Sequence, residues 1–206
     1  QNLIQGGALP ETLVGSAGND LIYGRGGNDV IRPGAGNDLI NGGDQRFVAW
    51  LPSLYANFGI LPSSATTDFD TLDYSTVIAS GGIRVDLDNA TVSYLGSGAD
   101  PIGIDQYTGI EIISGTRQAD LVSGRLPGRG AVGEQNALRF VGNGGSDTVD
   151  LASLLNRDRT TTSVQVSYEW ANGISLTADP DGGTLKVAYG SGTSQGVDTL
   201  KGVIAI

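Results

Sequence analysis

The sequence predicts an all-β protein in which short parallel turns stack into a solenoid and antiparallel strands are inserted between the stacks. Three observations support this class. A nine-residue unit occurs three times in succession between residues 15 and 41. The same spacing returns between Gly115 and Gly142. Other segments, such as residues 83–95, alternate apolar and polar side chains, as half-buried strands do.

The nine-residue units are GSAGNDLIY, GRGGNDVIR and PGAGNDLIN. They begin at Gly15, Gly24 and Pro33, and each has glycine at position 4, aspartate at position 6 and isoleucine at position 8. The position-6 residues are Asp20, Asp29 and Asp38. Glycine permits tight turns and close backbone approach, and the isoleucine points inward from a short strand. A fixed period of this kind indicates a solenoid.

A stack of such turns needs a cation. Ordering a residue costs about 1–2 kcal/mol, whereas one buried isoleucine per turn contributes roughly 2 kcal/mol at best. Aspartates repeated along one edge also repel each other. Carboxylates together with the carbonyls that glycine exposes are hard oxygen ligands, which suit Ca²⁺. The sequence therefore predicts several calcium ions bound between turns.

These units resemble the G-G-x-G-x-D-x-U-x nonapeptide of RTX (repeats-in-toxin) proteins, also called the hemolysin-type calcium-binding repeat. The resemblance implies a parallel β-roll, a form of β-solenoid, that folds with Ca²⁺. It also implies an extracellular or cell-surface protein secreted by the type I route. A flexible Gly/Asp-rich linker is the alternative, but a linker does not keep an aliphatic residue at every ninth position.

The resemblance further implies which atoms hold each ion. An ion lies between one turn and the next but one, and both position-6 carboxylates bind it. The carboxylate pairs are then Asp20 with Asp38, Asp29 with Asp70, and Asp38 with Asp120. Carbonyls at positions 1 and 3 of one turn and 2 and 4 of the other complete the shell. They belong to Gly15, Ala17, Gly34 and Gly36 for the first ion, Gly24, Gly26, Gly43 and Asp68 for the second, and Pro33, Ala35, Thr116 and Gln118 for the third.

Residues 1–73 form the N-terminal array, with an insertion at 45–67. Residues 6–14 are a degraded capping unit with Glu11 at position 6. The unit that starts at Gly42 resumes at Asp68, which places Asp70 at position 6. The insertion contains the aromatic residues Phe47, Trp50, Tyr55 and Phe58. It is either a cap over the edge of the roll or a surface for a partner or for self-assembly.

Residues 74–114 are predicted to be an inserted segment of β-strands rather than nonapeptide turns. The block from DTLDYS through GGIRVDLDNATV to ADLVSG resembles a module that occurs between nonapeptide arrays in large secreted RTX proteins. Asp86 and Asp88 lie two residues apart, which on a strand puts both on one face. Such a pair of carboxylates is a weak candidate for acid–base chemistry.

Residues 115–150 are the second array. Position 8 is apolar in each unit, and position 6 holds Asp120, Arg129, Leu138 and Asp147. Arg129 is expected two turns before Asp147, on the same side of the roll, and so could pair with it in place of Ca²⁺. Alternatively, residues 124–132 are a loop, because Pro127 falls at position 4 of that unit.

Residues 151–206 are predicted to be a β-hairpin excursion and a return strand, continuing into further repeats. The hairpin turn is expected at residues 179–183. A longer internal repeat aligns residues 70–75 with 147–152, and residues 105–113 with 198–206. Because the first residue is Gln1 and the repeat stops short, we expect a fragment or a processed product.

Charge and composition exclude several classes of function. The formal charge of −10 argues against binding to nucleic acid or to anionic membranes. The chain has no His and no Cys, which excludes a Ser-His-Asp triad and most zinc sites within it. We expect no enzyme but a structural or assembly module of an adhesin, S-layer protein or exoprotein, self-associating or packing on neighbouring domains. The alternatives are the non-catalytic appendage of a secreted protease, lipase or epimerase, and direct sugar or ice binding by the flat faces.

Overall fold

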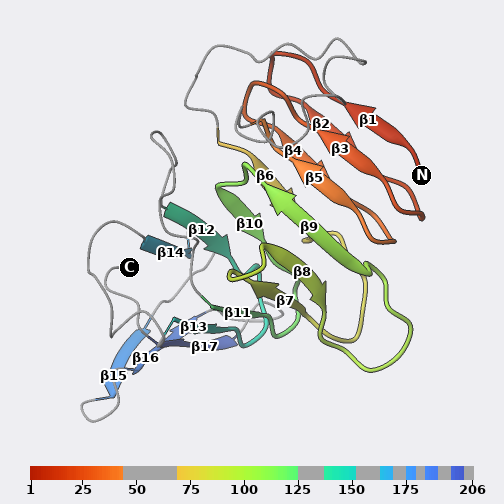
Figure 1. Ribbon diagram of the computed structural model, residues 1–206. Helices are drawn as coiled ribbons and strands as arrows, with labels where there is room; N and C mark the ends of the chain where they lie inside the picture. The colour runs from red at the N-terminus through yellow and green to blue at the C-terminus, as the bar shows by residue number, and fades with distance from the viewer. Residues whose placement is uncertain are drawn as a thin grey trace.

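The computed structural model describes residues 1–43, 69–124, 137–151, 163–168, 175–179, 184–189 and 196–201, and these contain strands and turns without helix. The strands form two sheets (Figure 1). Sheet A runs in the order β1 (Leu3–Gln5), β3 (Leu21–Tyr23), β5 (Leu39–Asn41), β9 (Ile104–Thr108), β8 (Thr91–Tyr94), β7 (Ile83–Asp86), β11 (Leu121–Ser123), β13 (Thr148–Asp150), β17 (Gly196–Lys201), β16 (Thr184–Tyr189) and β15 (Ser175–Asp179). Sheet B runs β14 (Ser163–Ser167), β12 (Ala137–Val141), β10 (Ile112–Ser114), β6 (Thr71–Asp73), β4 (Val30–Arg32) and β2 (Thr12–Val14).

Consecutive turns of the N-terminal array alternate between the two sheets, so each strand pairs in parallel with the next but one. In sheet A, Ile22 of β3 lies opposite Ile40 of β5. In sheet B, Ile31 of β4 lies opposite Leu72 of β6, although 41 residues separate them. The degraded unit at residues 6–14 supplies β2, whose Leu13 pairs with Ile31. This all-β, parallel arrangement confirms the predicted fold class.

Two antiparallel meanders interrupt sheet A. Strands β7, β8 and β9 pair antiparallel in sequence, and β9 then rejoins the stack parallel to β5. Strands β15, β16 and β17 repeat this arrangement, with β17 parallel to β13. The segment predicted to be a separate insertion, residues 74–114, therefore contributes three strands to sheet A and β10 to sheet B.

The duplication agrees with the sequence in one place and differs in another. Residues 105–108 and 198–201 occupy equivalent strands, as their alignment predicts. The alignment of residues 70–75 with 147–152 is wrong, because β6 lies in sheet B and β13 in sheet A. The equivalent of Tyr74, which follows β6, is Tyr168, which follows β14.

The second array contains fewer stacked turns than its nine-residue spacing predicts. Strand β11 pairs directly with β13, and β10 pairs directly with β12. No strand lies between the members of either pair, so the neighbour of Asp147 on the preceding strand is Asp120. Asp120 thus occupies the place beside Asp147 that the nine-residue register assigns to Arg129. Arg129 itself, like the four aromatic residues of 45–67, lies outside the described residues.

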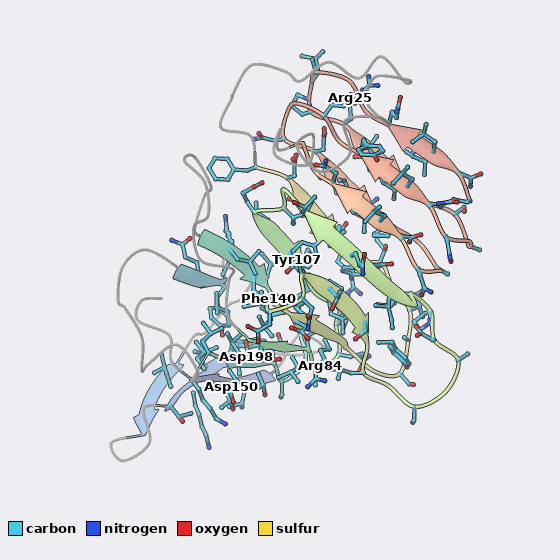
Figure 2. All side chains as sticks on the ribbon, viewed as in Figure 1. Arg25, Arg84, Tyr107, Phe140, Asp150 and Asp198 are labelled. Carbon is cyan, nitrogen blue, oxygen red and sulfur yellow. The ribbon has the colours of Figure 1, made fainter. Side chains whose placement is uncertain are left out.

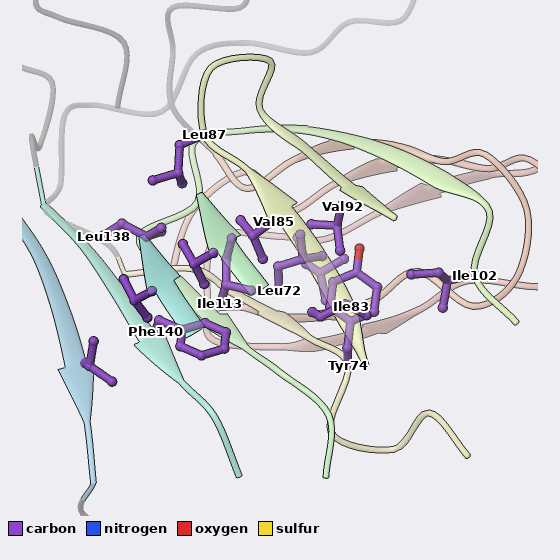
Figure 3. Packing of buried hydrophobic residues seen from close by; sticks show 14 of the residues in the cluster. Leu72, Tyr74, Ile83, Val85, Leu87, Val92, Ile102, Ile113, Leu138 and Phe140 are labelled. Carbon is purple, nitrogen blue, oxygen red and sulfur yellow. The ribbon is translucent and has the colours of Figure 1, made fainter. Parts of the chain in front are cut away.

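The core is a column of position-8 side chains between the sheets. Its fully buried members include Ile22, Ile31, Ile40, Leu72, Ile113, Val122, Phe140 and Val149. Figure 3 shows Tyr74 and Phe140 adding aromatic rings to this column beside Leu72 and Ile113. Because each turn contributes one side chain to the column, the loss of one cannot be relieved by a second layer of the core.

Ile113→Ala should therefore lower the free energy of unfolding by about 2–5 kcal/mol, since it leaves a cavity in a one-residue-deep core. Ile78→Ala is the matched control, because Ile78 is 99% exposed and its truncation should change stability by less than about 0.5 kcal/mol. Denaturant unfolding in excess Ca²⁺ measures both. Equal effects of the two substitutions would contradict the assigned core.

Candidate metal centre

Position-6 carboxylates form ladders along the turns that lead into each sheet. In sheet A, the backbone N–H of Asp20 donates to Oδ1 of Asp38 at 2.7 Å, and that of Asp38 donates to Oδ1 of Asp105 at 3.0 Å. A second ladder joins Asp120 to Asp147 at 2.9 Å and Asp147 to Asp198 at 2.8 Å. Each of these hydrogen bonds holds the carboxylate of one turn against the backbone N–H of the turn stacked on it in the same sheet.

Sheet B carries a ladder of the same kind. The N–H of Asp29 donates to Oδ1 of Asp70 at 2.8 Å, and that of Asp70 donates to Oε2 of Glu111 at 2.9 Å. The N–H of Glu11 donates to Oδ1 of Asp29 at 2.9 Å. The structure thus brings together two of the three predicted pairs, Asp20 with Asp38 and Asp29 with Asp70.

The third predicted pair, Asp38 with Asp120, is not formed. Asp105 lies above Asp38 instead, and Asp120 begins the second ladder, where Oδ1 accepts the N–H of Ile83 at 2.8 Å. Sequence reasoning missed Asp105 because its unit begins with Asp100, Pro101 and Ile102 in place of the glycine-rich start of a nonapeptide. The signal in the sequence that identifies Asp105 as a ladder carboxylate is the alignment of residues 105–113 with 198–206, which places it opposite Asp198.

The carbonyl ligands expected for the third ion are separated for the same reason. Pro33 and Ala35 stack on the turn of Gly15: the N–H of Ala35 donates to the Ser16 carbonyl at 2.9 Å. Thr116 instead donates from its N–H to Oδ2 of Asp120 at 2.8 Å, within its own turn. Gln118 lies against Gly145, in the turn that stacks on it in the same array. Of the second set, Asp68 lies outside the described residues.

The position-1 glycines are required by close oxygen contacts. A Cβ built on Gly24 would overlap the carbonyl oxygen of Gly42 and lie 2.7 Å from Oδ2 of Asp29. A Cβ on Gly42 would likewise overlap the Gly109 carbonyl and lie 2.5 Å from Oδ2 of Asp70. At each of these two glycines, a carbonyl oxygen from the turn stacked on it and a carboxylate oxygen from its own turn therefore lie close together. Hard cations bind such groups of oxygens.

The ladder carboxylates are almost completely removed from water. Asp29, Asp38, Asp120 and Asp147 are each no more than 2% exposed. Oδ2 of Asp38 and Oδ2 of Asp147 are buried and accept no hydrogen bond. Because an unsatisfied buried carboxylate oxygen is strongly unfavourable, each of these two groups needs either a bound cation or a proton.

Burial also changes the acidity of these groups. It raises the pKa of Asp147 to about 9, and the neighbouring Asp120 and Asp198 carboxylates add to the rise. It raises the pKa of Asp120 to about 7 and that of Asp38 to about 6. Within the sheet A ladders Asp20 differs, because the N–H of Ser16 donates to it and holds its pKa below the usual range. Without a cation, burial therefore disfavours the ionised form of Asp38, Asp120 and Asp147.

Among the described residues, no group of three or more His, Cys, Asp or Glu side chains could hold a metal. An ion in these ladders would therefore be held by two carboxylates together with backbone carbonyls. Asp86 and Asp88 do not form the shared-face pair that their spacing suggested. Asp88 lies in the turn after β7, where its N–H donates to Oδ1 of Asp86 at 3.0 Å.

Comparison with protein families supports this assignment of the N-terminal ladder. Residues 5–40 match the RTX calcium-binding nonapeptide repeat in four copies. This segment is an RTX array. The matched residues include Asp20, Asp29 and Asp38 with their glycine turns, and so the first carboxylates of both sheets belong to a calcium-binding repeat. Among the described residues, no helix is long and apolar enough to cross a membrane.

Two solved structures align with the chain over 96% of its length. One is the extracellular lipase LipA from Serratia marcescens, with 14% identity, a TM-score of 0.31 and 37% of the lipase chain covered. The other is the AlgE6R3 subunit of the Azotobacter vinelandii mannuronan C5-epimerase, with 18% identity, a TM-score of 0.23 and 73% covered. TM-scores this low support no conclusion about this chain. No curated protein matches it.

The glycine contacts give a direct test of the RTX array. Gly24→Ala should destabilise the calcium-loaded protein by about 1–3 kcal/mol, because the new methyl group meets backbone and carboxylate oxygens that cannot move apart. Gly18→Ala should be tolerated, since nothing lies within 4 Å of a Cβ at that position. Calcium titration followed by circular dichroism measures both variants. A larger loss for Gly18→Ala would refute the stacking.

The raised pKa values predict opposite pH dependences with and without metal. In metal-free protein, the folded pKa values of about 6 to 9 exceed the unfolded value of about 3.9. Their stability contribution is therefore present below pH ~4 and lost as pH rises through 6 to 9. With Ca²⁺ bound, the ligand pKa values fall below ~3.9, and stability is lost as pH falls through them.

Thermal melts at pH 4.5, 6 and 8, on metal-stripped protein and in excess Ca²⁺, measure the two slopes. The metal-free protein should be most stable at pH 4.5 and should lose its melting transition by pH 8, whereas the calcium-loaded melting temperature should rise or stay level over the same range. Slopes of the same sign in both conditions would show that the ladder carboxylates do not bind the ion.

Proposed function

We propose that the chain is a calcium-dependent β-roll module that folds on binding Ca²⁺ and serves as a structural part of a larger secreted or cell-surface protein. The observation that carries the proposal is the pair of buried, unsatisfied oxygens, Asp38 Oδ2 and Asp147 Oδ2, in ladders with converging carbonyls. A structure that buries such carboxylates without a cation is unfavourable, and so ion binding and folding are coupled.

The ions are assigned to pairs of turns in the same sheet. Asp20 and Asp38 hold one ion with the carbonyls of Gly15, Ala17, Gly34 and Gly36. Asp29 and Asp70 hold another with those of Gly24, Gly26 and Gly43. Asp120 and Asp147 hold a third. Asp120 is thus assigned to an ion with Asp147, and not to one with Asp38. When bound, Ca²⁺ supplies the positive charge that lets stacked carboxylates stay ionised. The chain's own contribution is the register that superimposes them.

Calcium sites built from backbone carbonyls and few carboxylates bind in the range of extracellular modules, about 10⁻⁴–10⁻³ M. Such sites fill outside the cell, which favours an extracellular location and type I secretion in the unfolded, calcium-free state. The role is structural, because the chain has neither His nor Cys for nucleophilic or zinc-dependent catalysis. We place it in an adhesin, S-layer protein or exoprotein, with neighbouring domains or further copies as partners.

The chain spans 37% of the lipase chain that it matches, so the activity of a whole protein containing it is a separate question. The sequence of the full-length gene distinguishes the two classes of parent. Tandem assembly domains support the adhesin or S-layer class, whereas an upstream catalytic domain supports the appendage of a secreted enzyme.

At pH 8, where the ladder carboxylates of the metal-free protein are charged, removal of Ca²⁺ should abolish most of the β-sheet signal, and millimolar Ca²⁺ should restore it. Asp38→Asn should reduce the number of bound ions, measured by native mass spectrometry and calorimetry, because it removes charge from a ligand while keeping its shape. Asp88→Asn is the control: Asp88 is an exposed carboxylate in the turn after β7, outside the ladders, and its loss should leave the ion count unchanged. A spectrum that does not respond to chelator would overturn the proposal.

A further inference from the structure

Each ladder of sheet A ends in a carboxylate that is already fully hydrogen-bonded by protein donors. Asp105 accepts the N–H of Asp38 at Oδ1 and the hydroxyl of Tyr74 at Oδ2, the latter at 2.6 Å. Asp198 accepts the N–H of Asp147 at Oδ1 and the hydroxyl of Tyr168 at Oδ2, at 2.8 Å. By contrast, Oδ2 of Asp38 and of Asp147, one step earlier, accepts nothing.

The two tyrosines occupy equivalent positions in the duplicated fold. Tyr74 follows the position-8 residue Leu72 of β6 by two residues, and Tyr168 follows Val166 of β14 by two residues. Each tyrosine extends from the end of a sheet B strand across the core. Its hydroxyl reaches the carboxylate of the sheet A strand that ends a meander, Asp105 in β9 or Asp198 in β17. The second junction adds Tyr189, whose hydroxyl lies 3.1 Å from Oδ1 of Asp198 and whose ring is 5.6 Å from that of Tyr168. Figure 2 labels Asp198 at this junction.

These hydroxyls differ from the other donors to ladder carboxylates. Ser16 and Thr116 bind Asp20 and Asp120 from within the same turn, four residues away, so they move with the turn that an ion would reshape. Tyr74 is 0% exposed and packs in the core, as Figure 3 shows. Its hydroxyl cannot leave Asp105 unless the two sheets separate.

The turn that leads to Asp105 has also lost the glycine of a calcium-type turn. Five residues before Asp105, at position 1, stands Asp100. Its Oδ1 accepts the N–H groups of Ile102 at 3.0 Å and Gly103 at 2.8 Å, and so a side chain organises this turn. The turns around Asp29 and Asp70 have Gly24 and Gly42 at this position.

We propose that Tyr74 and Tyr168 determine where the rows of calcium ions end. Asp105 and Asp198 are structural carboxylates and not calcium ligands, and each tyrosine hydroxyl takes the place that an ion occupies one step earlier. The meanders are thereby joined to the roll by bonds that do not need metal. This inference rests on the proposed calcium function, since it assigns which carboxylates of the ladders bind and which do not.

The test compares neighbouring carboxylates of one ladder in the full chain. Asp38→Asn should bind fewer Ca²⁺ ions than the wild type, whereas Asp105→Asn, a substitution of the same kind one step along, should bind the same number. Tyr74→Phe keeps the buried ring and removes only the donor; it should bind one ion more than the wild type. Tyr94→Phe is its control, because the hydrogen bond that the Tyr94 hydroxyl makes is with Ser80, at 3.2 Å, and not with a ladder carboxylate.

Native mass spectrometry gives the ion counts, and Asp198→Asn with Tyr168→Phe repeats the comparison at the second junction if a variant of the first fails to fold. Loss of an ion from Asp105→Asn, or an unchanged count in Tyr74→Phe, would overturn the assignment. A wild-type chain that binds no Ca²⁺ would instead refute the calcium function itself. The two failures are therefore distinguishable.

Discussion

The structure depends on stacking carboxylates at the spacing of neighbouring strands, about 5 Å. Two like charges at that distance repel by about 3 kcal/mol at an effective dielectric constant of about 20. Repeating this repulsion along each ladder would offset much of the stabilisation from a core that is one side chain deep. Three features of the chain relate to this repulsion: the glycines at the turns, the alternation of turns between the sheets, and the tyrosines at the junctions.

The chain compensates the stacked charges in three ways, which differ in how firmly they are tied to the fold. Backbone N–H groups bind one oxygen of each ladder carboxylate, as at Asp20 and Asp38. Hydroxyls within the same turn bind the first carboxylate of each sheet A ladder, from Ser16 and Thr116. Tyrosine hydroxyls close the last one. The middle members, Asp38 and Asp147, keep an open oxygen, and the need for a cation is concentrated there.

The part of the fold that could be predicted is the part in which neighbouring turns are also neighbours in sequence. For Asp20 and Asp38 the period itself gives the partner, and the position-8 isoleucines give the register. For Asp38 and Asp105 the partner is 67 residues away, and no period links them. The second array fails for the opposite reason. The nine-residue spacing is kept at Gly115, Gly124, Gly133 and Gly142, but strand β11 pairs directly with β13, so the spacing overestimates the number of stacked strands. A period predicts geometry only when each unit adds a strand.

The roll tolerates these interruptions because its cohesion is local to each pair of strands. Loop-closure entropy rises by only about 0.6 kcal/mol for each doubling of loop length, so lengthening a connection from 18 to 41 residues between Asp29 and Asp70 costs little compared with one buried side chain. What the chain must restore after each excursion is a carboxylate at position 6 and an apolar residue at position 8. Strands β6, β9 and β17 do this with Leu72, Tyr107 and Leu200. Because the meanders re-enter at a carboxylate that a tyrosine already holds, the metal-dependent stacks on either side can be joined without extending the row of ions through them.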